Sequence, residues 1–322
     1  MKKISILVPC YNEEENVIPM SEAIIKLFEN ELDQYDYELV FIDNDSTDNT
    51  RMLLRKLCEG NKRIKAILNV RNFGQNNSPY YGLLQTTGMC TINIACDFQD
   101  PIELIPQYIR EWEKGYKVVV GVKKSSKENI IMYKLRGLYY KTLKKFSEVE
   151  LIEHFTGTGL YDRDFLEILR KLQDPSPFLR GIIAELGYKV KKIPYEQMKR
   201  RAGKTHNNFL SLYDIAMLSF TSYTKMGLRV ATFIGVAVAF LSAIIGLVYL
   251  ILKFVYWDRF MAGIMPVVIG IFFLGAVQLI FLGIMGEYIL SINQRIMNRP
   301  LVVEEERINF ENEEDKYYED EK

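Results

Sequence analysis

Two long apolar segments in the last third of the sequence constrain this chain more than any other feature. Residues 230–252 and 261–285 are each dominated by aliphatic and aromatic side chains. The hydrocarbon core of a bilayer is about 30 Å thick, so a helix needs about 20 apolar residues to cross it. An α-helix also satisfies its own backbone hydrogen bonds, which lipid cannot do. We therefore predict two transmembrane helices.

The preceding residues 1–206 alternate between strand-like and helix-like patterns. Short β-branched runs at 4–8, 39–42, 64–68, 91–95 and 117–122 predict strands, and helical periodicity at 14–31, 48–59 and 102–114 predicts helices. Such alternation is typical of βαβ units in an α/β domain with a mostly parallel sheet flanked by helices. A sheet of this kind binds ligands beyond the carboxyl ends of its strands.

Acidic groups follow three of the predicted strands. Glu13 follows the first strand, Asp43 and Asp45 follow the second, and Asp97 follows the fourth. Carboxylates that share one crevice repel each other unless a cation or hydrogen-bond donors occupy it. A sugar nucleotide meets both demands, because its ribose and base donate hydrogen bonds and its diphosphate carries a divalent ion. Oxygen ligands suit Mg²⁺ or Mn²⁺.

Two further aspartates in these loops have a simpler interpretation. Asp48 precedes the second predicted helix, and Asp100 precedes Pro101 at the start of the third, so we expect both to cap helices. No GxGxxG or GKS sequence follows any predicted strand, which argues against a dinucleotide site or a P-loop.

Charge and cysteine usage predict a cytoplasmic catalytic domain. The four cysteines show no CxxC spacing, which fits buried free thiols in a reducing compartment. Basic residues flank the outer ends of the two apolar segments, at Lys225, Arg229, Arg295 and Arg299. The positive-inside rule therefore places the catalytic domain and both termini in the cytoplasm, as parts of a multi-pass protein of the plasma membrane.

Seven motifs occur along the chain in an order typical of one enzyme family. They are Val8-Pro9-Cys10-Tyr11-Asn12-Glu13-Glu14, Asp43-Asn44-Asp45-Ser46-Thr47-Asp48, Arg71-Asn72-Phe73-Gly74, Asp97-Phe98-Gln99-Asp100-Pro101, Leu160-Tyr161-Asp162-Arg163, Arg180-Gly181 and Arg200-Arg201-Ala202-Gly203-Lys204-Thr205. With the two apolar segments, they make nearly the whole chain similar to family 2 glycosyltransferases of the GT-A fold. The nearest branch is the polyisoprenyl-phosphate glycosyltransferases, which includes bactoprenol glucosyltransferases and dolichyl-phosphate mannose synthases.

This resemblance implies roles for individual residues. Those expected to hold the donor nucleoside are Pro9, Tyr11, Glu13, Asp43 and Asp45. Asp97 and Gln99 are expected at the diphosphate and its Mg²⁺ or Mn²⁺ ion. Arg200, helped by Lys204 and Thr205, is expected to clamp donor phosphates, because a guanidinium offers a fixed fork of donors. A lipid-binding patch beside the membrane is the alternative for Arg200. The motif at 71–74 is expected to shape a turn near the site.

Two positions depart from the family pattern. The family often has an Asp-x-Asp sequence that ends at the position of Asp97, but here Ala95 replaces the first carboxylate. The family also often has an acidic residue, a candidate general base, at a position that Gly157 occupies here. Asp162, a few residues further on, is then the remaining candidate for the base. A polyprenyl phosphate is mostly dianionic at neutral pH and needs no proton removed, so we expect Asp162 to matter modestly.

Three basic residues are candidates to hold the acceptor phosphate: Lys134, Arg136 and Arg180. Ordinary exposed helix charges are an equal alternative for the first two.

In the membrane part, residues 207–228 predict a helix that lies in the bilayer interface or packs on the catalytic domain. The two transmembrane helices occupy 229–290, where glycines allow close packing within one chain or in a homo-oligomer. Residues 291–322 would then form a short strand at 299–303 and a disordered acidic tail.

The sequence therefore predicts a membrane-bound inverting transferase. It would move a hexose from a nucleotide sugar to undecaprenyl or a related polyprenyl phosphate, for modification of cell-envelope glycans. A UDP-linked donor is favoured over a GDP-linked one, and no nucleic-acid partner is expected. A processive polysaccharide synthase would need a Gln-x-x-Arg-Trp motif, and neither Trp112 nor Trp257 follows one. A degenerate transferase domain that serves lipid-sugar transport is the non-catalytic alternative.

Overall fold

The structure is a computed structural model, and it describes residues 1–124, 152, 154–201, 217–218, 220–221, 226–255 and 264–310. It divides into two compact units, one drawn from residues 1–137, 151–207 and 298–322 and the other from 138–150 and 208–297. Several predicted features lie outside the described residues. They are Lys134, Arg136, Lys204, Thr205, most of the predicted interfacial helix and the acidic tail.

The first unit is built on an eight-stranded sheet with the strand order β7-β5-β6-β4-β1-β2-β3-β8. Its strands are β1 (Lys2–Cys10), β2 (Tyr35–Asp43), β3 (Ile64–Asn69), β4 (Cys90–Asn93), β5 (Val118–Lys123), β6 (Phe155–Asp162), β7 (Val190–Tyr195) and β8 (Glu304–Ile308). All of them run in one direction except β6 and β8, which pair antiparallel with their neighbours. The predicted α/β fold with a mostly parallel sheet is confirmed.

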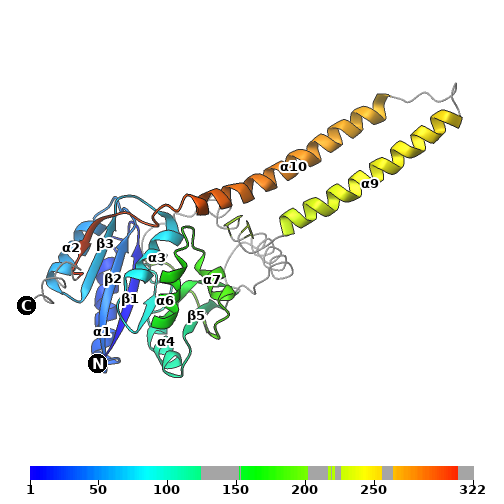
Figure 1. Ribbon diagram of the computed structural model, residues 1–322. Coiled ribbons are helices and arrows are strands. Elements are labelled where there is room, and N and C mark those ends of the chain that lie inside the picture. The colour runs from blue at the N-terminus through cyan, green and yellow to red at the C-terminus, as the bar shows by residue number, and fades with distance from the viewer. Residues whose placement is uncertain are drawn as a thin grey trace, which may run out of the picture. The chain divides into compact units, whose positions relative to one another are not determined.

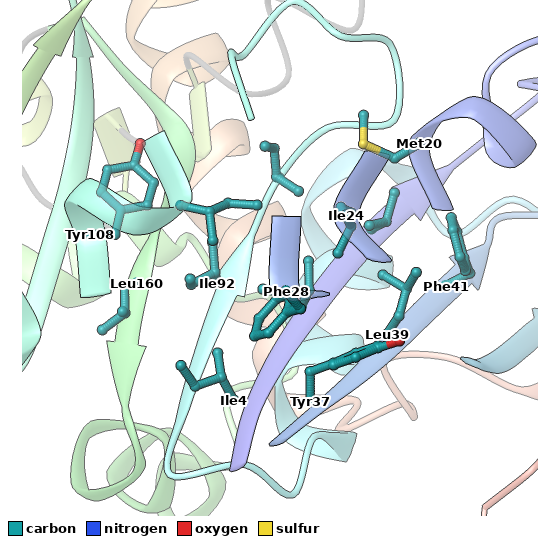
Figure 2. Close-up of a cluster of buried hydrophobic side chains, with 14 of the residues drawn as sticks. Ile4, Met20, Ile24, Phe28, Tyr37, Leu39, Phe41, Ile92, Tyr108 and Leu160 are labelled. Atoms are coloured by element: carbon teal, nitrogen blue, oxygen red, sulfur yellow. The ribbon is translucent and has the colours of Figure 1, made fainter. Parts of the chain in front are cut away.

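Helices cover both faces of this sheet (Figure 1). One face packs against α1 (Val17–Asn30), α2 (Thr50–Gly60) and α4 (Leu104–Glu113). The other packs against α3 (Gly74–Gln85), α6 (Arg163–Leu172) and α7 (Leu179–Glu185). Because successive strand residues point to opposite faces, a buried parallel strand reads as a continuous apolar run. Figure 2 shows one of the two resulting cores, in which Phe28 and Ile24 of α1 pack over Tyr37 and Leu39 of β2.

The predicted elements match the observed ones unevenly. All five predicted strands and all three predicted helices are present, with shifted ends. Helix α3 escaped prediction because its first turns are polar and Pro79 lies inside it. The strand predicted at 299–303 is wrong: the strand is β8, whose sequence Glu-Glu-Glu-Arg-Ile has low strand propensity. Contacts with the rest of the unit override that propensity, as described below.

A buried carboxylate ties the amino ends of the central strands together. Glu38 of β2 is 1% exposed, and it accepts hydrogen bonds from Ser5 Oγ at 2.5 Å, from Lys65 Nζ at 2.8 Å and from the Thr87 amide at 2.6 Å. Burial by itself would raise its pKa, but these hydrogen bonds dominate and lower the pKa of Glu38 to about 2. Glu38 is therefore ionised at neutral pH and stabilises the sheet.

The second unit contains two long helices, α9 (Met226–Val255) and α10 (Ile264–Ile296). Each contains a segment long and apolar enough to cross a membrane, namely Leu228–Val248 with mean hydropathy 2.5 and Phe273–Ile296 with mean hydropathy 1.8. Helix α10 continues past the predicted end of the second span, so Glu287 and Arg295 lie in its last turns. Its 33 residues measure about 50 Å, more than the hydrocarbon core requires.

Candidate active site

The loops that carry the predicted site residues begin side by side at the carboxyl edge of the sheet. In the register of β1 with β2, Cys10 lies opposite Asp43, and β4 pairs with β1 on its other side. The loops after β1, β2 and β4 therefore open onto the same edge, as the parallel arrangement predicts.

The loops after β1 and β2 are cross-linked by hydrogen bonds. The Asn12 amide donates to Ser46 Oγ at 2.8 Å, and Asn12 Oδ1 accepts from the Thr47 amide at 2.8 Å. Asp48 accepts from the Glu14 amide at 3.1 Å and from the Thr50 amide at 3.0 Å. Helix α2 has Asn49 at its N-cap, so Asp48 lies one residue before the cap that was predicted for it. Its bond to the Thr50 amide still satisfies a donor of the first helical turn, and its bond to the Glu14 amide holds the two loops together.

Asp43 is completely buried at the end of β2. One carboxylate oxygen accepts from the Ser46 amide at 3.0 Å, and the other accepts from the Ser46 hydroxyl. Arg51 Nε lies 3.5 Å from Asp43 Oδ2. Burial raises the pKa of Asp43, although the Ser46 bonds and the Arg51 charge partly offset that effect. Asp43 therefore shapes the loop through Ser46.

Asp45 occupies the exposed side of the same loop. Its backbone has a φ of 68°, a left-handed conformation that Asp tolerates better than most residues. Its side chain is 38% exposed, and its Oδ1 lies 3.8 Å from Arg51 Nη1. Of the two aspartates predicted to hold a nucleoside, Asp45 is thus the one that faces solvent.

The motif at 71–74 forms a turn that is fastened to the site by Asn44. Asn44 Nδ2 donates to Asn72 Oδ1 at 2.9 Å, and Asn44 Oδ1 accepts from the Phe73 amide at 2.9 Å. Asn72 Oδ1 also accepts from the amide of Gly74, whose φ of 87° favours glycine. The predicted turn-shaping role of this motif is confirmed.

An arginine bridges the loops after β1 and β4. Arg200 Nη2 lies 2.9 Å from Asp97 Oδ2, and Arg200 Nη1 lies 3.9 Å from Glu13 Oε1. Glu13 is 8% exposed and Asp97 is 5% exposed. Burial raises the pKa of Glu13, while its hydrogen bond with Asn16 and the Arg200 charge lower it. One guanidinium thus compensates two nearly buried carboxylates.

The segment that carries Arg200 runs alongside the loop after β4. The Met198 amide donates to the Gln99 carbonyl at 3.0 Å, and the Arg201 amide donates to the Asp97 carbonyl at 3.3 Å. Gln197 Nε2 donates to Gln99 Oε1 at 2.8 Å. These bonds fix the start of the basic segment against the two residues predicted to meet the diphosphate.

Asp100 does not cap a helix, so that prediction is wrong. Helix α4 begins at Leu104, and the Asp100 carboxylate instead accepts from the hydroxyls of Thr158 and Tyr195. It is 5% exposed. The preference of Asp for helix starts was outweighed by two hydroxyl donors from β6 and β7, which sequence spacing cannot reveal.

Asp162 lies at the opposite edge of the sheet from Asp97, which contradicts its candidacy as a base near the transferred sugar. Strand β6 runs antiparallel to β4, so its last residue pairs with Cys90, the first residue of β4. Asp162 Oδ1 accepts from the Asp164 amide and caps α6, and Oδ2 accepts from Trp112 Nε1 at 2.7 Å. Its role in the structure is to secure these elements.

The other end of β6 does reach the site edge. The Gly157 carbonyl accepts from Asn93 Nδ2 at 3.1 Å and from the Tyr161 hydroxyl at 3.0 Å. Burial raises the pKa of Tyr161, and the nearby charge of Arg180 in the first turn of α7 partly offsets this. Pro9 at the end of β1 and Tyr11 in the following loop are half-buried.

Sequence reasoning missed four residues that organise this site: Asn12, Asn44, Ser46 and Arg51. Asn12, like Asp45, has a positive φ, 55°, and Asn and Asp are the residue types other than glycine that adopt this conformation most easily. The available signal in the sequence was the presence of Asn12 and Asn44 in loops that directly follow two predicted strands. Arg51 offered none, because its position in the first turn of α2 resembles any surface arginine.

Comparison with known proteins identifies the family to which this chain belongs. Residues 5–170 match the family model for glycosyl transferase family 2. The chain is 33% identical over 288 residues to the prophage bactoprenol glucosyl transferase homolog of Escherichia coli strain K12, which covers 89% of this chain and 93% of that protein. It is also 33% identical over 299 residues to the bactoprenol glucosyl transferase of Shigella phage SfX, covering 92% and 97%.

A solved structure similar to this one is mannosyl-3-phosphoglycerate synthase from Rubrobacter xylanophilus, at 14% identity and a TM-score of 0.47 over 67% of this chain and 71% of that chain. The sequence matches define the protein as a glycosyltransferase. More narrowly, it belongs to glycosyltransferase family 2, as its motifs predict. The prediction that the chain is a glycosyltransferase is thus confirmed.

Enzymes of this fold commonly use a divalent metal. The described residues contain no cluster of three or more His, Cys, Asp or Glu side chains suited to a metal ion. Asp97 offers one carboxylate, whose Oδ1 accepts from the Gln99 amide at 3.1 Å and whose Oδ2 meets Arg200. This oxygen chemistry fits Mg²⁺ or Mn²⁺ held by one or two protein groups, with substrate phosphates and water as the other ligands.

Proposed function

We propose that this protein is an inverting hexosyltransferase that uses a nucleotide sugar, UDP-linked, and a polyprenyl phosphate of the undecaprenyl type. The observation that carries the proposal is the Arg200 bridge between Asp97 and Glu13 at the carboxyl edge of the sheet. The names of the bactoprenol glucosyl transferases and the two candidate membrane spans support the lipid acceptor.

The donor would lie across the loops after β1, β2 and β4. Asp45 is placed to accept hydrogen bonds from the nucleoside, with Asp43 positioning its loop, and Pro9, Tyr11 and Glu13 would line the same region. Asp97 and Gln99 would hold the metal ion, which neutralises charge on the departing diphosphate when bound. Arg200 would turn from Asp97 to the donor phosphates, with Lys204 and Thr205 beside it. A guanidinium suits this exchange because it fits carboxylate and phosphate equally well.

The transfer itself requires one bond to form and one to break. An oxygen of the lipid phosphate attacks C1 of the hexose, and the bond from C1 to the diphosphate oxygen breaks on the opposite face. The nucleoside diphosphate leaves with the electron pair, so the configuration at C1 inverts. Because the acceptor is already dianionic, no proton must be removed. Arg200 stabilises the leaving charge, and Arg180, with Lys134 and Arg136, would hold the acceptor phosphate.

The same proposal assigns a multi-pass location in the plasma membrane. Helices α9 and α10 would span the bilayer, and the basic residues at their outer ends favour a cytoplasmic catalytic unit with both termini on that side. A nucleotide sugar from the cytoplasm would then meet the lipid phosphate at the inner surface.

A donor screen tests this function. The purified protein in detergent is incubated with undecaprenyl phosphate, Mg²⁺ and one radiolabelled donor at a time: UDP-glucose, UDP-galactose, UDP-N-acetylglucosamine or GDP-mannose. Label should enter the organic phase with a UDP-linked hexose, and mass spectrometry should find a single hexose on each lipid. Asp97→Asn serves as the inactive control. If no donor labels the lipid while the protein is folded and binds nucleotide, the proposed reaction is wrong.

A further inference from the structure

We propose that Glu305, on the strand that follows the second candidate span in the sequence, is a positioning residue for the nucleotide site. It acts by holding Arg51, which in turn faces Asp43 and Asp45. This inference rests on the proposed function, because it assigns the Asp45 loop to the donor nucleoside. It makes the C-terminal strand part of the donor site, although the strand lies about 250 residues away in the sequence.

The geometry shows a chain of charges that crosses three elements. Arg51 Nη2 lies 2.6 Å from Glu305 Oε2, which is the shortest contact of this guanidinium. Its Nε lies 3.5 Å from Asp43 and its Nη1 lies 3.8 Å from Asp45. Arg51 Nη2 also donates to the Asn69 carbonyl at 3.4 Å. The Arg51 side chain is 18% exposed and Asp43 is buried, whereas Glu305 is 50% exposed, so solvent screens the contact with Glu305 more than the contact with Asp43.

The distances assign different roles to the three carboxylates. Glu305 is within hydrogen-bond range of Arg51, whereas Asp43 and Asp45 feel its charge from beyond that range. Arg51 therefore stabilises the Asp45 loop without using the oxygens that a nucleoside would need. Without the Glu305 contact, the guanidinium would be free to turn toward Asp45 and compete with the ligand. The rotamer entropy of a long arginine side chain favours such release.

Other contacts hold β8 in place without Glu305. The strand pairs with β3, and the Val70 amide donates to the Val303 carbonyl at 3.1 Å. Asn309 Nδ2 donates to the carbonyls of Cys58 at 2.7 Å and Ile64 at 2.8 Å. Replacing the Glu305 carboxylate by an amide should therefore leave the strand in the sheet.

The next residue supplies a matched control. Glu306 forms an ion pair of 2.7 Å with Arg55, which lies one helical turn after Arg51 on α2 and farther from the Asp45 loop. Glu305→Gln and Glu306→Gln thus remove the same charge from the same strand, but only the first removes it from the chain of contacts that reaches the site.

The experiment compares wild type, Glu305→Gln and Glu306→Gln as full-length protein in detergent. Isothermal titration measures the Kd of UDP and of GDP in the presence of Mg²⁺, and thermal melting measures stability. We expect Glu305→Gln to raise the Kd of the better nucleotide about three- to tenfold and to raise the donor KM similarly, with kcat within about twofold. Glu306→Gln should stay within about twofold in every quantity, and both variants should melt alike.

A third variant tests the link through Arg51. Arg51→Lys keeps the charge but loses the fork of donors, and it should weaken nucleotide binding at least as much as Glu305→Gln. Adding Glu305→Gln to Arg51→Lys should then have little further effect, because the two residues act as one unit.

Each result decides the inference. Equal Kd values for Glu305→Gln and wild type, with normal nucleotide binding by wild type, would overturn it and leave the proposed function standing. If Glu305→Gln and Glu306→Gln weaken nucleotide binding equally and both lower the melting temperature, β8 only stabilises the fold. That result would also overturn the inference. If wild type binds neither UDP nor GDP, the proposed function fails and this inference fails with it.

Discussion

Replacing Arg200 by alanine should weaken catalysis and strengthen metal binding at the same time. In the structure Arg200 lies 2.9 Å from Asp97 and 3.9 Å from Glu13, whose side chains are 7% and 9% exposed. In the donor complex the same guanidinium would contact the leaving diphosphate. The alanine variant therefore loses a cation at the leaving group and leaves two nearly buried carboxylates with less compensation.

The loss of activity can be estimated from the kind of contact that is removed. A hydrogen bond to a charged group contributes about 1.5–3 kcal/mol. At about 1.4 kcal/mol for each factor of ten, the loss corresponds to a fall in kcat/KM of roughly 10- to 150-fold. Arg200→Lys keeps the charge but cannot contact two oxygens in a fixed plane, so it should fall between wild type and alanine.

Metal binding without nucleotide should change in the other direction. Wild-type Arg200 occupies Asp97 Oδ2, so a free divalent ion must compete with it. Arg200→Ala removes this competitor and leaves Glu13 and Asp97 to repel each other, which favours a cation between them. Titration of free Mn²⁺ by electron paramagnetic resonance should show tighter binding in the variant. Lys199→Ala is the control, because it removes an equal charge from an exposed position in the same segment.

The two measurements together can refute the reasoning. Steady-state kinetics with labelled donor and polyprenyl phosphate gives kcat/KM, and the Mn²⁺ titration is independent of turnover. If Arg200→Ala and Lys199→Ala have the same kcat/KM and the same affinity for free Mn²⁺, Arg200 neither stabilises the leaving group nor competes with metal for Asp97. If activity falls while Mn²⁺ binding is unchanged, the pair with Asp97 does not control metal access.

Three other substitutions have defined outcomes. Ala95→Asp should supply a second carboxylate and lower the Mg²⁺ concentration for half-maximal activity, which a metal titration measures. Asp162→Asn should cost about 1–2 kcal/mol of stability, because it weakens a helix cap and the Trp112 bond, yet keep kcat near that of wild type. Glu38→Gln should destabilise the protein by about 3 kcal/mol at pH 7, since the pKa falls from 4.5 to about 2 on folding. A carboxylate with a depressed pKa stabilises the fold above its unfolded pKa, so the difference from wild type should shrink as the pH falls from about 4.5 toward 2 in urea-unfolding curves.

The sheet and its active edge were predictable because they depend on local periodicity and one general rule. Buried parallel strands such as β1 and β2 read as continuous apolar runs, and their parallel direction follows from the helix that lies between them in the sequence. The rule that ligands bind beyond the carboxyl ends of such strands then brought Glu13, Asp43 and Asp97 to one edge without any tertiary information.

Predictions failed where a strand reverses or a charge finds a distant partner. Asp162 was assigned to the site because it lies near Gly157, where the family often has an acidic residue, but the antiparallel direction of β6 carries it to the far edge. Asp100 has the sequence context of a helix cap, but hydroxyls from two other strands bind it. Glu305 has poor strand propensity, and its place in β8 depends on contacts with distant parts of the chain, namely the pairing of β8 with β3 and the ion pair with Arg51.

The charge balance of the site explains how one missing carboxylate can be tolerated. With Ala95 in place of an acid, the described edge holds Asp97 and Glu13 against one guanidinium, so Arg200 can satisfy both before the donor binds. In the proposed reaction Arg200 would move to the diphosphate, Asp97 would then need a new cation, and the donor would bring one. Nucleotide and divalent ion should therefore bind better together than separately, and by linkage each must raise the affinity of the other by the same factor. A second carboxylate would hold the ion before the donor arrives and would weaken this dependence. Under the proposed function, the single acid at Asp97 would favour a site in which metal, donor and Arg200 change partners in one binding event.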